Sequence, residues 1–336
     1  MNQSQNVSGY RPQQRNREMS NITTSQKLPS ANVFIGFIVF QSLFLILGIF
    51  GNACVIIYNV FLNHSKTPTS YFVVNLAIND YFACCIIYPI WMATFMRSVL
   101  RITSDQMLFC LVDQIGAKGV ILSILTLLAI TVDKFVFINW HLKYDLIVTW
   151  RRTYFALLMI WIFGVILTPF IHLLKTESRV HRFCGANTLL YVIGFFLYIL
   201  IPFFIIFILN YKIFKIAQEQ RSKIAVNSMS SDIMQSRNPS STNSVFSRWR
   251  ITRELKNIKT FGIIIGVLLC CILPNTTLRI IGLLWCNESC VLFEVGLSFA
   301  ALVQVNSIVN PFIYGIRQRE YRNAFRRLWS KIYHRN

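Results

Sequence analysis

Seven long apolar runs divide this sequence, and they leave few folds open to it. They cover residues 34–60, 71–95, 107–132, 153–174, 188–211, 261–285 and 291–314. Each run can cross a bilayer, which takes about 20 helical residues. Backbone groups in lipid must be hydrogen-bonded within the protein, so such spans are helices or closed barrels. The alternating pattern of a barrel is absent. We therefore predict an all-α membrane protein with a bundle of seven transmembrane helices.

The basic residues orient this bundle. If the N-terminus is outside, the cytoplasmic segments hold 22 Lys and Arg residues, against 9 in the outer segments. An excess on the cytoplasmic side is the usual distribution. The net charge of +20 then reflects a face that lies near anionic lipid, and it does not indicate nucleic-acid binding. We expect a multi-pass protein of the plasma membrane with its N-terminus outside.

Composition predicts three parts of the chain. They are an outer tail at 1–33, the bundle at 34–315 and a surface helix with a short cytoplasmic tail at 316–336. The outer tail carries glycosylation sequons at Asn6 and Asn21. A Ser- and Asn-rich inner loop at about 217–250 is predicted to be flexible. In the last part, apolar residues recur at helical spacing among arginines, which is typical of a short amphipathic helix on the membrane surface.

The cysteines separate by depth. Five lie inside spans and are expected to pack as small apolar residues. The other four lie at the outer face: Cys110, Cys184, Cys286 and Cys290. That side is oxidising, so pairing is expected, and four cysteines allow three pairings. The short CNESC loop favours a Cys286–Cys290 disulfide, which leaves Cys110 to pair with Cys184.

Asp80 lies in the middle of the second span, where an acid costs roughly 2.5–3.5 kcal/mol. Polar residues at similar expected depth occur in two other spans: Ser123, Asn306, Ser307 and Asn310. A carboxylate surrounded by neutral oxygens suits a small hard cation and water. Asp80 is therefore either a cation or proton site or a structural acid satisfied by water. Intramembrane acids are usually functional, which favours the first interpretation.

Short motifs occur in order along these spans. They are GN at 51–52, LAIND at 76–80, Cys110, VDKF at 132–135, Trp161, Cys184, Pro202, CILP at 271–274 and NPFIY at 310–314, followed by a helix. Together they resemble the rhodopsin-like (class A) G protein-coupled receptors over about residues 34–330. In that family the residues matching Asp80 and its four polar neighbours form a sodium pocket that favours the resting state. The resemblance thus implies an allosteric sodium ion and no other cofactor.

The resemblance also assigns roles at the inner end of the third span. Asp133 and Lys134 stand where the family has an acid and an arginine. It implies a Lys134–Glu254 latch and, with Tyr314, a surface that couples to heterotrimeric G proteins, arrestin and a receptor kinase. Lysine lacks the planar guanidinium group of arginine, so this position does not predict how strongly the protein couples to a G protein. The alternative is an ordinary charged helix end.

Two other switch positions depart from the family. Ile272 stands where a tryptophan is usual, two residues before Pro274, and Asn210 stands where a tyrosine is usual. Together with Lys134, three switch positions differ. They favour either unusual signalling or a non-signalling decoy receptor.

The outer half of the bundle is the expected ligand pocket. Its candidates are Asp113, Lys118, Arg279, Glu294 and Gln304. Amine receptors carry an aspartate where this chain has Gly116 or Ala117, and opsins carry a lysine where it has Gln304, so both classes are disfavoured.

Two bases, Lys118 and Arg279, would suit an anionic small molecule or peptide. Arg279 could equally pair with Glu294 or Asp113 as an internal lid, because buried charges are usually paired.

The leading prediction is therefore a receptor. A transporter or channel is less favoured because the chain lacks the paired repeats of transporters. An enzyme is not expected, because no span carries paired carboxylates with a histidine or an HExxH motif.

Overall fold

The computed structural model describes residues 31–63, 66–99, 106–166, 188–234, 262–277, 292–318, 320–324, 326 and 330. Residues 42–336 form one compact unit, and every contact discussed below lies within it. Predictions that concern other residues lie outside the described part of the chain.

Each predicted apolar run contains a helix. The elements are α2 (Ala31–Ile57), η1 (Tyr58–Leu62), α3 (Pro68–Phe82), η2 (Ala83–Ile87), α4 (Tyr88–Val99), α5 (Gln106–Asn139), η3 (His141–Lys143), α6 (Tyr144–Ile147), α7 (Trp150–Trp161), η4 (Ile162–Ile166), α9 (Thr188–Phe195), η5 (Phe196–Leu200), α10 (Ile201–Met234), a helix at Gly262–Thr277 and α12 (Leu292–Arg317). The prediction of an all-α membrane fold is confirmed. Helix α10 runs further than expected, because residues 217–234 of the inner loop predicted to be flexible at about 217–250 are helical.

Four helical stretches in the described residues are long and apolar enough to cross a membrane. They are Ile38–Leu62, Pro68–Thr94, Ile115–Asn139 and Val192–Ile216. Two shorter apolar helices cover Gly262–Thr277 and Leu302–Ile316. Large apolar side chains such as Phe204 and Phe207 are exposed along α10. An exposed apolar surface of this kind suits a helix that faces lipid.

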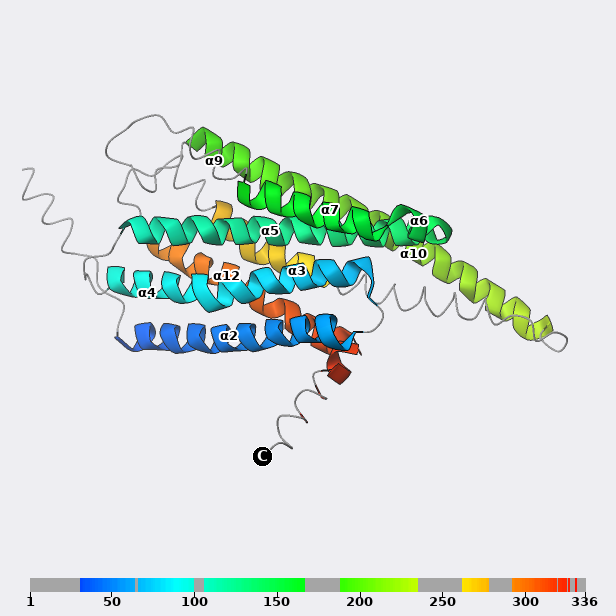
Figure 1. The fold of residues 1–336 in the computed structure, drawn as a ribbon, viewed down its shortest axis with the longest axis horizontal. Coiled ribbons are helices and arrows are strands. Elements are labelled where there is room, and N and C mark those ends of the chain that lie inside the picture. Colours follow the sequence, from blue (N-terminus) through cyan, green and yellow to red (C-terminus); the bar gives the residue numbers. More distant parts are fainter. Residues whose placement is uncertain are drawn as a thin grey trace, which may run out of the picture. The chain divides into compact units, whose positions relative to one another are not determined.

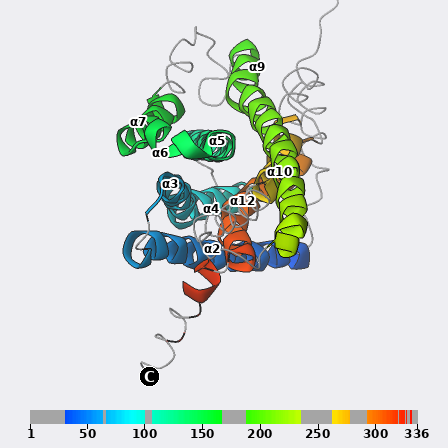
Figure 2. The same cartoon turned by 90° about the vertical axis from the view of Figure 1, so that its right-hand side faces the viewer.

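Helix α5 is the centre of the bundle. It packs most extensively against α3 and α10, and it also contacts α4, α7 and η4 (Figures 1 and 2). The main core cluster joins residues of α3, α5 and α10 with residues of the Gly262–Thr277 helix and α12. Helix α10 extends beyond the ends of its neighbours (Figure 1). Four polar residues of α5 are buried within the bundle: Ser123, Thr126, Thr131 and Asp133.

Single π-helical turns interrupt three of the spans, each shortly before a proline. Element η2 precedes Pro89, η4 precedes Pro169 and η5 precedes Pro202. Proline has no backbone N–H, and its ring crowds the carbonyl group of the preceding turn. A π turn accommodates such a defect by inserting one residue, and these turns are frequent at functional sites. Element η2 begins three residues after Asp80 and so sets which side chains of α4 face the same cluster.

Glycine allows α2 and α12 to approach closely. A Cβ atom on Gly51 would lie 2.7 Å from Cγ of Pro311, and one on Gly48 would lie 2.6 Å from Sγ of Cys84. Both distances are too short for a side chain. The two glycines therefore permit the backbone of α2 to lie against the elements that carry the polar residues.

Candidate functional site

Asp80 is completely buried on α3. One carboxylate oxygen, Oδ2, accepts a hydrogen bond of 2.8 Å from Nδ2 of Asn310 on α12, and Ser307 lies one helical turn before Asn310. The other oxygen, Oδ1, has no donor among the described residues. A buried carboxylate oxygen without a donor is costly, so this atom points to a missing partner such as a cation or water.

Asn52 on α2 contributes a second such oxygen. Its Nδ2 donates to the backbone oxygens of Gly48 at 3.0 Å and Ser307 at 2.9 Å. Its Oδ1 is buried and, within the described residues, has no donor. Asn52 bonds to the backbone of Ser307 and Asp80 bonds to the side chain of Asn310, one turn later in α12, so both residues contact the same part of that helix. A hard cation bound by oxygens would satisfy both, and the residues present therefore fit the predicted sodium ion.

Ser123 on α5 joins the cluster through Asn79. Nδ2 of Asn79 donates to Oγ of Ser123 and to the backbone oxygen of Gly119, both at 3.0 Å. No direct hydrogen bond from Ser123 to Asp80 is found in the described part of the chain. Asn306 is buried on α12 beside Ser307. The structure thus brings the five predicted residues into the interior of one bundle, with Asn310 in direct contact with Asp80.

Tyr88 is a member of this cluster that sequence analysis missed. Its hydroxyl lies 3.0 Å from Oγ of Ser307. The sequence did not predict that Tyr88 and Asp80 face the same cluster, because the π turn η2 lies between them and changes the helical spacing. A tyrosine inside an apolar span close to a proline was the only available clue.

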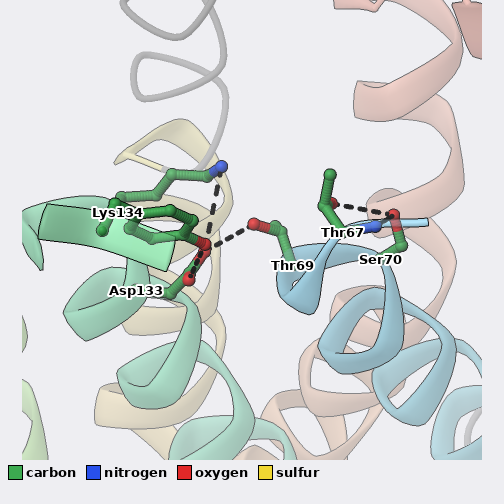
Figure 3. A network of polar contacts seen from close by, with 6 residues as sticks. Thr67, Thr69, Ser70, Asp133 and Lys134 are labelled. Carbon is green, nitrogen blue, oxygen red and sulfur yellow. Dashed lines mark hydrogen bonds and ion pairs between the residues drawn. The ribbon is translucent and has the colours of Figure 1, made fainter. Parts of the chain in front are cut away.

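Asp133 is the centre of a second polar cluster, near the C-terminal end of α5 (Figure 3). Its Oδ2 accepts a hydrogen bond of 2.5 Å from the hydroxyl of Thr69 on α3, and its Oδ1 accepts one of 2.6 Å from the hydroxyl of Tyr144 on α6. Nζ of Lys134 lies 3.9 Å from Oδ2. Asp133 therefore joins three elements, and Thr69 and Tyr144 are partners that the sequence did not reveal.

Lys134 is itself buried, with its ammonium group paired to the neighbouring carboxylate. Glu254, its partner in the predicted latch, lies outside the described residues. The latch therefore remains a prediction.

Tyr314 ends the NPFIY motif and is buried against the C-terminal helix. Its ring stacks on Tyr321 with centroids 5.4 Å apart, and Tyr58 contacts Tyr321 from the other side at 4.5 Å. Asn59 and the Tyr321 hydroxyl lie within hydrogen-bond distance, at 2.9 and 3.1 Å. In this helix Tyr321 and Ala324 are buried while Arg322 is exposed, which fits an amphipathic element.

Ile272 and Asn210, the two other departures from the family pattern, make local contacts. Ile272 is 1% exposed and belongs to the main core cluster. Nδ2 of Asn210 donates to the backbone oxygen of Ile206 one turn earlier in α10. Ile272 therefore acts as ordinary core packing, and the Asn210 amide is used within its own helix.

The outer candidates are described only in part. Lys118 is partly buried on α5 and Gln304 is buried on α12. The remaining predicted residues, or their side chains, lie outside the described part: Asp113, Arg279, Glu294, Cys110, Cys184, Cys286, Cys290, Asn6 and Asn21. The five cysteines inside spans are free thiols; Cys54, Cys84 and Cys271 are buried, as expected for packing residues, whereas Cys270 is exposed.

In the part of the chain that the structure describes, apolar helices surround a buried acid and a charged cluster near the C-terminal end of α5, which is the arrangement of a multi-pass membrane protein with a polar interior. The family "7 transmembrane receptor (rhodopsin family)" matches residues 51–314. This match covers most of the chain, and the chain belongs to that family. The family is one of receptors rather than enzymes, which agrees with the prediction of a non-enzymatic protein.

Relatives of known name fall into two receptor groups. The alpha-1A adrenergic receptor of Oryzias latipes is 26% identical over 85% of this chain and 65% of its own length. The human alpha-1D adrenergic receptor is 27% identical over 88% of this chain and 56% of its own length. The human adenosine receptor A2b is 25% identical over 80% of this chain and 82% of its own length. The chain thus spans less than two thirds of the length of these two adrenergic relatives.

Proposed function

We propose that the protein is a plasma-membrane receptor, with its N-terminus outside, that transduces an extracellular ligand to heterotrimeric G proteins. Family membership supports this class of activity. The single observation that carries the proposal is the Asp133 cluster. It ties α3, α5 and α6 together at the inner end of the bundle, where such a protein has to open.

The surface beside this cluster suits a protein partner. Leu142 is 97% exposed, and Leu146 is exposed one turn further on. Two exposed arginines, Arg151 and Arg152, follow at the start of α7. An apolar side chain amid basic residues can anchor an amphipathic segment of a G protein. The same face would be the docking site for arrestin and, at the Ser-rich loop, for a receptor kinase.

The Asp80 cluster would act as the resting-state site for a sodium ion. The unpartnered oxygens of Asp80 and Asn52 support this assignment. A cation that binds only the resting arrangement shifts the population toward it. Agonist binding on the outer side would shift the population the other way. Lys118 supports an anionic ligand there, with Arg279 as its expected companion.

A decoy receptor that binds ligand without signalling is the second candidate. It is favoured by the three altered switch positions. Ile272 is packed as a core residue, Asn210 bonds within its own helix, and the Lys134 ammonium lies beside Asp133. Each of these side chains is engaged locally and would contribute little to a rearranged inner face.

A second-messenger panel in transfected cells, with and without a ligand library, tests the choice. Transduction predicts output in one G protein class that falls when Lys134 is changed to Ala. Lys143→Ala, which removes an exposed lysine nearby, is the matched control. Silence in every class, at full surface expression, would support the decoy.

A further inference from the structure

Tyr88 brings a further element, α4, to the Asp80 cluster. It is the first residue of α4, directly after the π turn η2, and its ring is partly buried beside Trp91 and Val112. Its hydroxyl lies 3.0 Å from Oγ of Ser307. Ser307 lies one turn before Asn310, whose Nδ2 donates to Asp80. Tyr88 therefore contacts the same turn of α12 that holds the carboxylate.

The chemistry of a hydroxyl group makes this path reversible. A serine hydroxyl has one proton to donate and two lone pairs. If the Ser307 hydroxyl turned toward the unpartnered oxygen of Asp80, the Tyr88 hydroxyl could donate to Ser307. If a cation were held at Asp80, the Ser307 oxygen would have to present a lone pair to it, and its proton would need another acceptor. The Tyr88 oxygen is positioned to be that acceptor.

We propose that Tyr88 is a positioning residue that sets the cation affinity of the Asp80 site by letting the Ser307 hydroxyl reverse its direction. The inference rests on the proposed cation site. It adds a determinant from α4, so that the contact between α4 and α12 becomes part of the site. Movement of α4 relative to α12 would then weaken cation binding, even with Asp80 and Asn310 in place.

Replacing Tyr88 by Phe keeps the ring and removes only the hydroxyl. The proton of Ser307 then loses its alternative acceptor, and the cation would have to compete with a bond from Ser307 to Asp80. Loss of one hydrogen bond of about 1 kcal/mol corresponds to about 5-fold in affinity. We expect sodium to bind about 3–10-fold more weakly to Y88F than to the unaltered protein.

The experiment uses the full chain in lipid nanodiscs. The midpoint of thermal unfolding is titrated with sodium chloride, and choline chloride holds the ionic strength constant, because a ligand of the folded state raises the midpoint according to its affinity. The matched control is Tyr81→Phe, which removes a hydroxyl from an exposed tyrosine of α3. Y88F is expected to need several-fold more sodium for the same shift, and Y81F is expected to behave as the unaltered protein.

A double-variant comparison separates positioning from packing. If Tyr88 acts through Ser307, Y88F should weaken sodium binding in the natural background and have no further effect in a Ser307→Ala background. An equal loss in both backgrounds would overturn the proposed route. Readings taken without sodium reveal any loss of stability that a purely structural role of Tyr88 would cause.

Asp80→Asn distinguishes this inference from the proposal on which it rests. If D80N abolishes the sodium shift and Y88F leaves it unchanged, the cation site stands and the role of Tyr88 is wrong. If the unaltered protein shows no sodium shift, or D80N retains a full one, the cation site itself is wrong, and the inference falls with it.

Discussion

Two hydroxyl groups from other elements hold the Asp133 carboxylate, and this arrangement gives a prediction at the scale of single residues. Thr69→Val removes the hydrogen bond from α3 and leaves a side chain of similar shape. Hydrogen bonds to charged groups contribute about 1.5–3 kcal/mol. If the bond exists only in the resting state, its loss shifts the population by roughly tenfold or more. We expect raised ligand-independent messenger output, normalised to surface expression.

Thr67 is the matched control for this variant. It lies in the same turn, and its Oγ1 is 3.1 Å from Oγ of Ser70, away from Asp133 (Figure 3). Thr67→Val weakens the start of α3 and leaves the Asp133 contacts unchanged. Equal increases in basal output from both variants would mean that helix stability, and not release of Asp133, is responsible.

Tyr321 gives a second prediction at this scale. Burial raises its pKa, so its hydroxyl stays protonated at neutral pH and the bond to Asn59 is kept; any stability that it contributes would be lost only as the pH rises through the raised pKa. Tyr321→Phe retains the stack on Tyr314 and loses the contact with Asn59. We expect a loss of about 1 kcal/mol, read as a lower thermal midpoint. An unchanged midpoint would show that Asn59 finds full compensation from its bond to Val55.

At the scale of elements, the contact between α2 and α12 depends on the absence of a side chain. A Cβ atom at Gly51 would meet the ring of Pro311, which is rigid and cannot move aside. Gly51→Ala should therefore separate the two helices and cost about 1–3 kcal/mol by overpacking. Thermal unfolding in nanodiscs measures this loss. The cation affinity should fall as well, because Asn52 lies next to Gly51 and bonds to α12.

Gly194→Ala is the control for this substitution. A Cβ atom there meets nothing within 4 Å, and the residue lies inside α9. Alanine favours a helix over glycine by roughly 0.5–1 kcal/mol. Gly194→Ala should therefore be neutral or slightly stabilising. If both variants lose stability equally, close packing at Gly51 is not the cause.

The helices themselves could be predicted from the sequence, since hydrocarbon permits few alternatives for an apolar run. The π turns could not, because their placement depends on how each proline is accommodated in the packed bundle. The same difference explains which residues of the site could be predicted from the sequence. Asp80, Ser307 and Asn310 were predicted from the rarity of polar groups in spans, whereas Tyr88 required the shifted register after η2. Thr69 and Tyr144 were missed because contacts across helices leave no periodic signal.

At the scale of the whole molecule, the two buried acids differ in how fully their oxygens are hydrogen-bonded. Asp80 in the middle of the bundle keeps an unpartnered oxygen, whereas both oxygens of Asp133 at the inner end accept hydrogen bonds. The inner cluster can therefore hold the bundle closed without an ion, and the central cluster can respond to one. A signal from the outer face would have to disturb both before the inner ends of the helices separate.

Lys134 stands where the family has arginine, and the last prediction restores the usual residue. Lys134→Arg adds a planar fork that can keep one bond to Asp133 while making another to a G protein or to a neighbouring helix. We expect nucleotide exchange on a purified G protein to rise several-fold, roughly the effect of one added charge-assisted bond. Lys143→Arg, an exposed lysine in the adjacent loop, should change nothing. If both variants stay silent with every G protein class at full surface expression, lysine is not the limiting element, and the decoy interpretation gains over transduction.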